Sequence, residues 1–303
     1  MKAKTPEPTR PKRLKFFLYG PPASGKTVGC IQLLPKAVII DTENGCANYG
    51  ALIRKQGSVI LASNEAEEII EEVRSLLSEK HEYTSLIIDP ITVFWQSIQD
   101  SWTSRFKANS KNPKDAEFED FGPRFWARAK STLKRFLALV ARLDMNVAMT
   151  AHQKDQYSDD GGFRKTGVTF DGEKRLDYFF DFVFRMEMAG PKRMAYAIKQ
   201  RSFPETIFKP SFEWDADSLR KAFGEEAFER PAEAAPLATA EQVQTVSALL
   251  ERLKREGHPA DETASKWKDK AGVEDLEDMR AADLGKCIAW CETTLASLTT
   301  KGA

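Results

Sequence analysis

A motif of eight residues near the amino terminus constrains the fold of this chain more than any other feature. Residues 20–27, GPPASGKT, fit the pattern G-x-x-x-x-G-K-[ST]. The apolar run at residues 14–19 predicts a buried strand before the motif, and residues 25–34 predict a helix after it. Backbone N–H groups of such a turn, together with the helix N-terminus, favour a phosphate group. The alternative is a chance match in a Gly/Pro turn, which leaves the flanking strand and helix unexplained. The residues predicted to bind phosphates are Gly20, Pro21, Pro22, Ala23, Ser24, Gly25, Lys26 and Thr27.

Three side chains supply the chemistry expected of a nucleoside triphosphate site. We expect Lys26 to reach the β- and γ-phosphates and the Thr27 hydroxyl to bind Mg²⁺. A carboxylate that positions the metal should end a neighbouring strand, and Asp89 ends the apolar run at 85–89. The alternative for Asp89 is a simple Asp-Pro turn. No N-K-x-D motif, which would read guanine, follows the loop. The expected cofactors are therefore ATP and Mg²⁺.

Strand and helix patterns alternate along residues 14–230. Amphipathic runs predict helices at 65–79 and 123–143, and polar stretches at 107–122 and 153–176 predict loops. The other predicted strands are 36–41, 58–61, 85–89, 146–152, 180–186 and 194–199. This order predicts an α/β fold with a mostly parallel β-sheet flanked by helices.

Changes in composition divide the chain into four segments. Residues 1–13 are predicted to be a flexible basic arm, and residues 14–230 the core. Residues 231–239 are an Ala/Pro linker, and residues 240–303 are predicted to be a small helical module that begins at a capping-box pattern on Thr239. The formal net charge of zero conceals this division. The first 15 residues carry six basic and one acidic residue, whereas the chain after residue 230 carries nine basic and thirteen acidic residues.

The overall composition excludes several classes of protein. A net charge of zero gives no support to a globally basic nucleic-acid-binding chain. Four cysteines and three histidines are scattered too widely for a disulfide framework or a zinc motif. The sequence holds no run of 18 apolar residues and no signal-peptide pattern after its basic start. We therefore expect a cytoplasmic protein with no membrane partner.

The catalytic base must come from outside the Asp89 strand, because Pro90 occupies the next position. Glu43 follows the predicted strand at 36–41 and is the best candidate. The alternative is a loop acid before the Asn44-Gly45 turn. In this placement the sequence resembles RecA-like P-loop ATPases, whose catalytic glutamate follows the same strand. The resemblance implies that Glu43 activates the attacking water.

The same resemblance implies roles for three further residues. His152 ends the predicted strand at 146–152, where RecA-like proteins carry a polar sensor of the γ-phosphate. Lys199 and Arg201 match a basic pair that reaches the phosphates of a neighbouring subunit in RecA-like filaments. Side chains two positions apart on a strand point the same way, so the pair can act together. The alternatives are an ordinary strand-end histidine and solvated charges on an edge strand.

As a whole, residues 14–210 look like the phage-encoded, core-only RecA-like ATP-binding proteins of the single-strand annealing and recombination group. The resemblance implies a Mg-dependent, DNA-stimulated ATPase that acts on single-stranded DNA in the cytoplasm, which for a phage protein is that of the bacterial host. It also implies a homo-oligomer with shared ATP sites and a single-strand-binding protein as partner. The strand and helix that RecA uses to form filaments have no counterpart in residues 1–13. Two other functions remain open: an ATP-switched annealing module that does not hydrolyse ATP, and a helicase or helicase-loader ATPase in replication.

Two regions are candidates for contacting nucleic acid. In the loop at 153–176 we expect Lys154, Arg164 and Lys165 to contact DNA, although the basic and acidic residues of this loop cancel. On the helix at 123–143, four arginines fall on one side when residues are placed at 100° intervals: Arg124, Arg128, Arg135 and Arg142. The alternatives are an ordinary surface loop and a solvated helix face.

Overall fold

The computed structural model describes residues 13–109, 122–158, 164–201, 208–234 and 236–301. The chain forms two compact units. Unit 1 comprises residues 1–70, 81–130 and 144–232, and unit 2 comprises residues 71–80, 131–143 and 233–303. The basic arm lies outside the described residues except for Arg13, and so does most of the polar stretch at 107–122.

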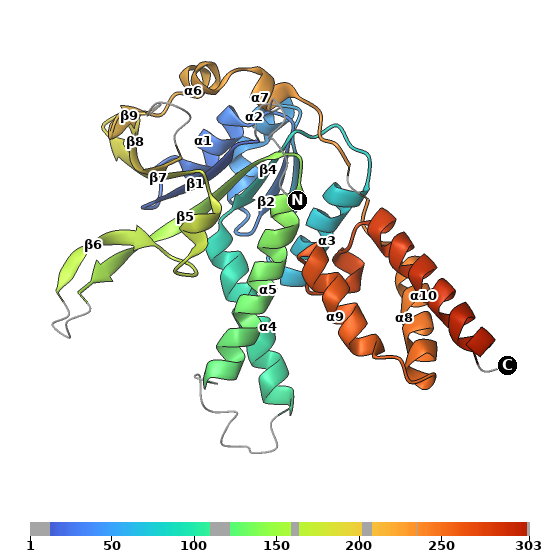
Figure 1. Ribbon diagram of the computed structural model, residues 1–303. Helices are drawn as coiled ribbons and strands as arrows, with labels where there is room; N and C mark the ends of the chain where they lie inside the picture. Colours follow the sequence, from blue (N-terminus) through green and yellow to red (C-terminus); the bar gives the residue numbers. More distant parts are fainter. Residues whose placement is uncertain (1–12, 110–121, 159–163, 202–207, 235, 302–303) are drawn as a thin grey trace. The chain divides into compact units, whose positions relative to one another are not determined.

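A mixed β-sheet, nine-stranded among the described residues, is the centre of unit 1 (Figure 1). Its strands are β1 (Lys15–Gly20), β2 (Ala37–Asp41), β3 (Val59–Ala62), β4 (Ser85–Asp89), β5 (Asn146–Tyr157), β6 (Lys165–Phe170), β7 (Phe182–Ala189), β8 (Lys192–Gln200) and β9 (Ser211–Glu213). Their order is β3-β2-β4-β5-β1-β7-β8-β9, with β6 paired to β5. The neighbours from β3 to β7 are parallel, and β6, β8 and β9 add antiparallel pairs. The prediction of a mostly parallel sheet flanked by helices is confirmed.

Helices cover both faces of this sheet. In unit 1 they are α1 (Lys26–Leu33), α2 (Gly50–Lys55), α4 (Ile91–Asn109), α6 (Ala216–Phe223) and α7 (Glu226–Glu229), and α3 (Ala66–Ser78) and α5 (Gly122–Arg142) run through both units. Figure 1 shows α1, α2 and α6 on one face of the sheet and α4 on the other. The strand that leads into the GPPASGKT motif therefore lies inside a three-layered core.

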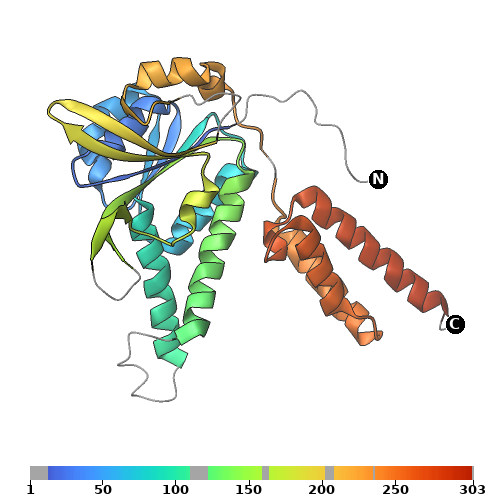
Figure 2. The same ribbon diagram turned by 60° about the vertical axis from the view of Figure 1, so that its left-hand side comes forward.

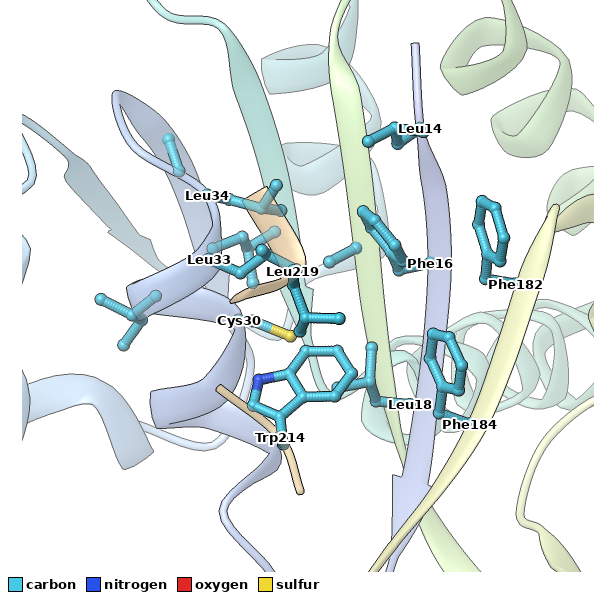
Figure 3. Close-up of a cluster of buried hydrophobic side chains, with 14 of the residues drawn as sticks. Leu14, Phe16, Leu18, Cys30, Leu33, Leu34, Phe182, Phe184, Trp214 and Leu219 are labelled. Atoms are coloured by element: carbon cyan, nitrogen blue, oxygen red, sulfur yellow. The ribbon is translucent and has the colours of Figure 1, made fainter. Parts of the chain in front are cut away.

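Strand β1 is buried on both of its faces, which fixes the position of the motif that follows it. Figure 3 shows Phe16 and Leu18 on one face, together with Phe182 and Phe184 of β7 and with Trp214, which precedes α6. On the opposite face, the ring of Phe17 stacks on Phe180 at 4.9 Å and meets the edge of Phe170 at 5.0 Å. Such a strand carries apolar residues at successive positions instead of alternating with polar ones.

The prediction of a loop over residues 153–176 is wrong for residues 153–157 and 165–170, which form strands. Strand β5 continues to Tyr157 and pairs with β6 as an antiparallel hairpin. This hairpin projects beyond the rest of the sheet (Figures 1 and 2). Its charged and glycine residues resemble a loop in composition. Strand pairing rests instead on the backbone and on the β-branched Thr166, Val168 and Thr169.

Unit 2 is helical in its C-terminal part. It contains α8 (Ala240–Arg255), α9 (Ala260–Ala271) and α10 (Ala281–Lys301), which enclose a buried cluster that includes Leu253, Leu284 and Cys291. The predicted capping box is confirmed: Gln242 N donates to Thr239 Oγ1 and Thr239 N donates to Gln242 Oε1, both at 3.1 Å. Among the described residues, no helix is long and apolar enough to cross a membrane.

Candidate active site

The carboxyl ends of four parallel strands meet at one edge of the sheet and form the candidate site. Strand β5 lies between β1 and β4, and Gly20 of β1 is opposite His152 of β5 in register. In the neighbouring pair of strands, Asp41 of β2 is opposite Asp89 of β4. A pocket of about 500 Å³ opens at this edge. The residues predicted from the sequence that line it are Gly20, Pro22, Ala23, Lys26, Thr27, Glu43, Asp89 and His152. Sequence-distant residues thus converge because their strands are parallel.

The backbone of the phosphate loop is closely packed and requires glycine at its first position. A Cβ on Gly20 would lie 2.2 Å from the carbonyl oxygen of Met186 in β7, and 2.9 Å from Ser24 Oγ. Gly25 has a left-handed backbone (φ 84°) just before α1 begins. No side chain caps the N-terminus of α1, so its first N–H groups are available to an anion.

The Lys26 ammonium lies over the phosphate loop. Its Nζ donates to the carbonyl oxygens of Gly20 and Pro21, both at 2.9 Å. Burial lowers the pKa of Lys26, and the negative charges of Asp89 and Glu43 oppose that shift. A bound phosphate would supply the missing negative charge beside this half-buried cation.

Asp89 is a buried carboxylate at the floor of the pocket, 5% exposed. It accepts hydrogen bonds from the hydroxyls of Thr150 and Thr27. Burial raises the pKa of Asp89 despite these two bonds. Cys46 Sγ lies 3.9 Å from Asp89 Oδ2, and burial raises the pKa of that thiol, so it remains a protonated donor. Asp89 is thus a buried acidic group whose described hydrogen-bond partners are two hydroxyls and a thiol.

Glu43 is placed by a turn that Asp41 organises. The Asp41 carboxylate accepts hydrogen bonds from Gly45 N at 3.0 Å and Cys46 N at 2.8 Å. This turn directs Glu43 toward the middle of β5, where Glu43 Oε1 lies 2.9 Å from His152 Nε2. The two residues predicted to be base and sensor are thus direct partners.

His152 is also bonded to the base of the β5–β6 hairpin. Its N–H donates to Thr92 Oγ1 at 3.0 Å, and the Thr92 hydroxyl donates to the carbonyl oxygen of Asp171 at 2.7 Å. Asp171 N in turn donates to the carbonyl oxygen of His152 at 2.8 Å. This closed set of bonds connects the pocket to both strands of the hairpin.

Comparison with known families identifies the domain that contains this pocket. Residues 12–205 match the family model described as AAA domain. The chain belongs to this family. The AAA domain is a P-loop ATPase domain, which implies that this chain binds nucleotide.

Two solved structures are distantly similar to this chain. The flagellar accessory protein FlaH from Methanocaldococcus jannaschii is 11% identical, with a TM-score of 0.37 over 67% of this chain and 85% of that chain. The ATPase EscN from the type III secretion system of enteropathogenic E. coli is 12% identical, with a TM-score of 0.35 over 91% of this chain and 67% of that chain. No curated protein matches this chain.

The donor set of the AAA-domain pocket fits Mg²⁺. Thr27 and Asp89 offer a hydroxyl and a carboxylate, the oxygen ligands that this ion prefers. No cluster of three or more His, Cys, Asp or Glu side chains that could hold a metal occurs among the described residues. A Mg²⁺ ion held by few protein ligands takes its remaining oxygens from phosphates and water. The buried, desolvated Asp89 carboxylate is the group that such an ion would stabilise.

Lys199 and Arg201 lie at the opposite edge of the sheet from the phosphate loop of the same chain. Lys199 Nζ donates to the carbonyl oxygen of Asp177 at 2.8 Å, and Arg201 pairs with Asp181 at 3.3 Å. Their end of β8 is paired with the start of β7, next to the start of β1. That edge is about 13 Å from Gly20 along β1, at 3.3 Å per residue. The pair therefore does not reach its own phosphate loop, and its role toward a neighbouring subunit stays a prediction.

The three basic residues predicted to contact DNA lie on the projecting hairpin. Lys154 pairs with Asp171 at 2.9 Å, and Lys165 pairs with Asp155 at 2.8 Å. Arg164 is exposed at the end of the hairpin loop. Part of that loop, residues 159–163, lies outside the described residues.

The arginines of α5 whose side chains the structure describes differ in their surroundings. The side chain of Arg124 lies outside what the structure describes, and Arg128 is exposed. Within unit 2, Arg135 lies 2.6 Å from the buried Asp278 and also pairs with Asp275 and Glu277. The Arg142 guanidinium donates to the carbonyl oxygen of Asp278. The geometry thus gives Arg135 and Arg142 protein partners and does not support their predicted contact with phosphates.

Two residues near the site are absent from the sequence-based prediction. Thr150 is the one polar side chain in the apolar stretch at 147–151. A polar residue at such a position could have indicated a hydrogen-bonding role near the end of the parallel strands. Arg193 of β8 packs against Gly25 of the phosphate loop. No pattern in the sequence indicates that contact, because it depends on how β8 returns along β7.

Proposed function

We propose that this AAA-domain protein binds and hydrolyses ATP at the described pocket. The observation that carries the proposal is the convergence of Lys26, Asp89 and Glu43 on one pocket of about 500 Å³. The loop N–H groups and Lys26 would hold the phosphates, and Glu43 would orient and deprotonate the attacking water. Thr27 and Asp89 would hold Mg²⁺, which neutralises charge on the phosphates when bound. His152 would position the Glu43 carboxylate.

Hydrolysis and binding measured on matched variants test this proposal. We expect Lys26→Ala to lose ATP affinity, because it removes the cation over the loop. Glu43→Gln should keep ATP affinity within about threefold and lose about 10²–10⁴ of kcat, the usual contribution of a general base. Glu225→Gln, an exposed site far along the chain, is the control. A wild-type protein that binds ATP with no turnover would favour the ATP-switched annealing module instead.

We further propose that single-stranded DNA binds the β5–β6 hairpin and stimulates hydrolysis. The resemblance to RecA-like recombination ATPases supports this, as does the direct bonding of the hairpin base to His152. The β5–β6 hairpin carries Lys154, Arg164 and Lys165. Its Tyr157 is 51% exposed and suited to stacking on a base.

The hairpin ion pairs do not prevent such binding. Lys154 and Lys165 are both about half exposed, and ion pairs between exposed side chains contribute little because water and salt screen them. A DNA phosphate can therefore replace Asp171 or Asp155 as partner. Each lysine that gains a phosphate contact should steepen the salt dependence of binding.

DNA affinity and DNA-stimulated turnover, measured across a salt series, test the hairpin. The triple variant Lys154→Ala, Arg164→Ala and Lys165→Ala should weaken binding and flatten the slope of log Kd against log salt by about two to three. The control is Lys192→Ala, which removes an equivalent exposed ion pair, with Glu213, from another hairpin. Equal affinity and slope in the triple variant and wild type would refute this site.

We also propose a homo-oligomer whose ATP sites are shared between subunits. Lys199 and Arg201 lie far from their own phosphate loop, which leaves them for a neighbour. Mixing Glu43→Gln subunits with Lys199→Ala/Arg201→Ala subunits should restore part of the turnover that each lacks alone. Mixtures that stay as inactive as their components would contradict shared sites.

A further inference from the structure

The pocket offers places for phosphates but none for a nucleobase. Among the described residues, its lining consists of glycines, prolines, an alanine and polar or charged side chains, and it includes no phenylalanine, tyrosine, tryptophan or branched aliphatic side chain. The groups suited to the terminal phosphate, Asp89, Glu43 and His152, come from β4, from the turn after β2 and from β5. The nucleoside should therefore leave on the other side of the loop, toward β7 and β8.

Arg193 occupies that other side. A Cβ on Gly25 would lie 2.5 Å from Arg193 Cδ and 3.0 Å from its Nε, so the arginine side chain crosses the last glycine of the loop. Its Nη1 donates to Gln32 Oε1 in α1 at 2.8 Å. The side chain therefore runs beside the pocket from Gly25, where Cδ and Nε lie, to Gln32 in the last turn of α1.

Of three arginines around α1, β7 and β8, Arg193 is the one that contacts the phosphate loop. Arg185 stacks on Tyr196 at 4.4 Å and pairs with Glu187. Arg220 donates to the carbonyl oxygens of Gln32 and Leu33 at the end of α1. Among the described residues, no carboxylate pairs with Arg193, and a guanidinium has five N–H donors.

The backbone that carries Arg193 is also fixed relative to α1, through Trp214. Gly29, one turn after Gly25, packs against Trp214, whose Nε1 donates to Gly29 O at 3.4 Å. Trp214 N donates to Arg193 O at 2.7 Å, so the same backbone that carries Arg193 is anchored to α1 (Figure 3 shows Trp214 in the buried cluster). A planar cation fixed in this way is preorganised for a flat, polarisable group.

We propose that Arg193 binds the nucleoside half of the nucleotide, with its guanidinium plane against the base. This inference rests on the proposed ATP binding and assigns the part of the ligand that the pocket itself does not hold. Arg193 then acts as a specificity residue for a nucleoside triphosphate over a bare polyphosphate.

Titration with two probes, Mg-ATP and Mg-tripolyphosphate, tests the proposal. Arg193→Ala should weaken ATP binding about tenfold or more, as expected for a lost base-stacking contact. It should leave the tripolyphosphate affinity within about threefold of wild type. Lys192→Ala, the exposed neighbour on β8, is the control and should change neither. Intact tripolyphosphate binding also reports that the variant has folded with a working loop.

Arg193→Lys is the second variant and keeps the charge if the alanine variant does not fold. It should still bind ATP more weakly than wild type and tripolyphosphate equally, because an ammonium lacks the planar face. Equal losses for both probes would overturn the proposal and make Arg193 a brace for the loop, and so would unchanged ATP affinity. A wild-type protein that binds neither probe would instead refute the proposed function itself.

Discussion

His152 Nε2 lies 2.9 Å from Glu43 Oε1, a contact that joins the middle of β5 to the turn after β2 in the lining of the pocket. Both side chains are a little over two-fifths exposed, so the pair adds little to the stability of the fold. Its consequence is orientation. Glu43 is held by the same residue whose backbone is bonded to the projecting hairpin.

We predict that His152→Ala lowers kcat about tenfold and leaves the KM for ATP nearly unchanged. The Glu43 carboxylate would lose its orienting partner, while the groups that bind phosphates stay in place. His152→Gln should recover part of the loss, because its amide can donate to the same carboxylate. Steady-state ATPase kinetics and a thermal unfolding scan, with no change expected in Tm, check this.

A double-mutant cycle separates orientation from an independent role of His152. In the Glu43→Gln background, His152→Ala should have almost no further effect on kcat, because the carboxylate to be oriented is gone. A full tenfold loss in that background would show that His152 acts without Glu43.

We predict that Asp89→Asn stabilises the nucleotide-free protein while abolishing ATPase activity. The carboxylate is 5% exposed and its pKa is raised by burial, so ionising it at neutral pH costs folding free energy. The amide removes that cost and can still accept a bond from Thr150. We expect Tm to rise by a few degrees in chelator, since 1 kcal/mol corresponds to about 2–4 °C in a domain of roughly this size.

The raised pKa of Asp89 also fixes how the stabilisation by Asp89→Asn should change with pH. With a raised pKa, the folded protein binds more protons at Asp89 than the unfolded chain does, and stability from this group falls as pH rises between the two values. The difference in Tm between Asp89→Asn and wild type should therefore be largest at neutral pH and disappear in acid, below the unfolded pKa. A difference that grows toward acid would contradict the assignment.

The sequence was sufficient to predict which residues meet at the pocket where their placement depends on local order along the chain. The phosphate loop, Asp89, Glu43 and His152 each follow a recognisable strand, and parallel strands bring their carboxyl ends together. Placement of Lys199 and Arg201 depends instead on the direction in which β8 returns, and i, i+2 spacing is the same at either end of a strand.

Other features were beyond prediction because they depend on tertiary contacts. The hairpin of β5 and β6 is polar on its exposed faces and has no apolar alternation, which is the main signal of a strand. The arginines of α5 look like one solvated or phosphate-binding face from helical periodicity. The acidic partners of Arg135, Asp275 and Asp278, are about 140 residues away in sequence. Helical periodicity cannot predict such distant contacts.

We predict that Gly20→Ala abolishes nucleotide binding. The new Cβ would lie 2.2 Å from a backbone oxygen of β7, and a paired central strand cannot move away as a flexible side chain would. The loop must then shift and misplace its N–H groups. Gly45→Ala is the matched control, because Gly45 also lines the pocket but its Cβ would meet nothing within 4 Å. Comparable ATP affinities for the two variants would contradict this account of the loop.

We predict that Arg135→Ala lowers stability and leaves nucleic-acid binding unchanged. Asp278 is 3% exposed at its side chain and would keep Arg74, at 3.1 Å, as its remaining cationic partner. When a buried carboxylate loses a charged hydrogen-bond donor, the free energy of unfolding falls by about 1–3 kcal/mol. Chemical unfolding of the full chain should show this loss, and Lys134→Ala, an exposed neighbour on α5, should not. If Arg135 contacted DNA phosphates, its removal would lower the slope of log Kd against log salt by about one. That slope should stay at its wild-type value, because the acidic residues of unit 2 already engage the guanidinium.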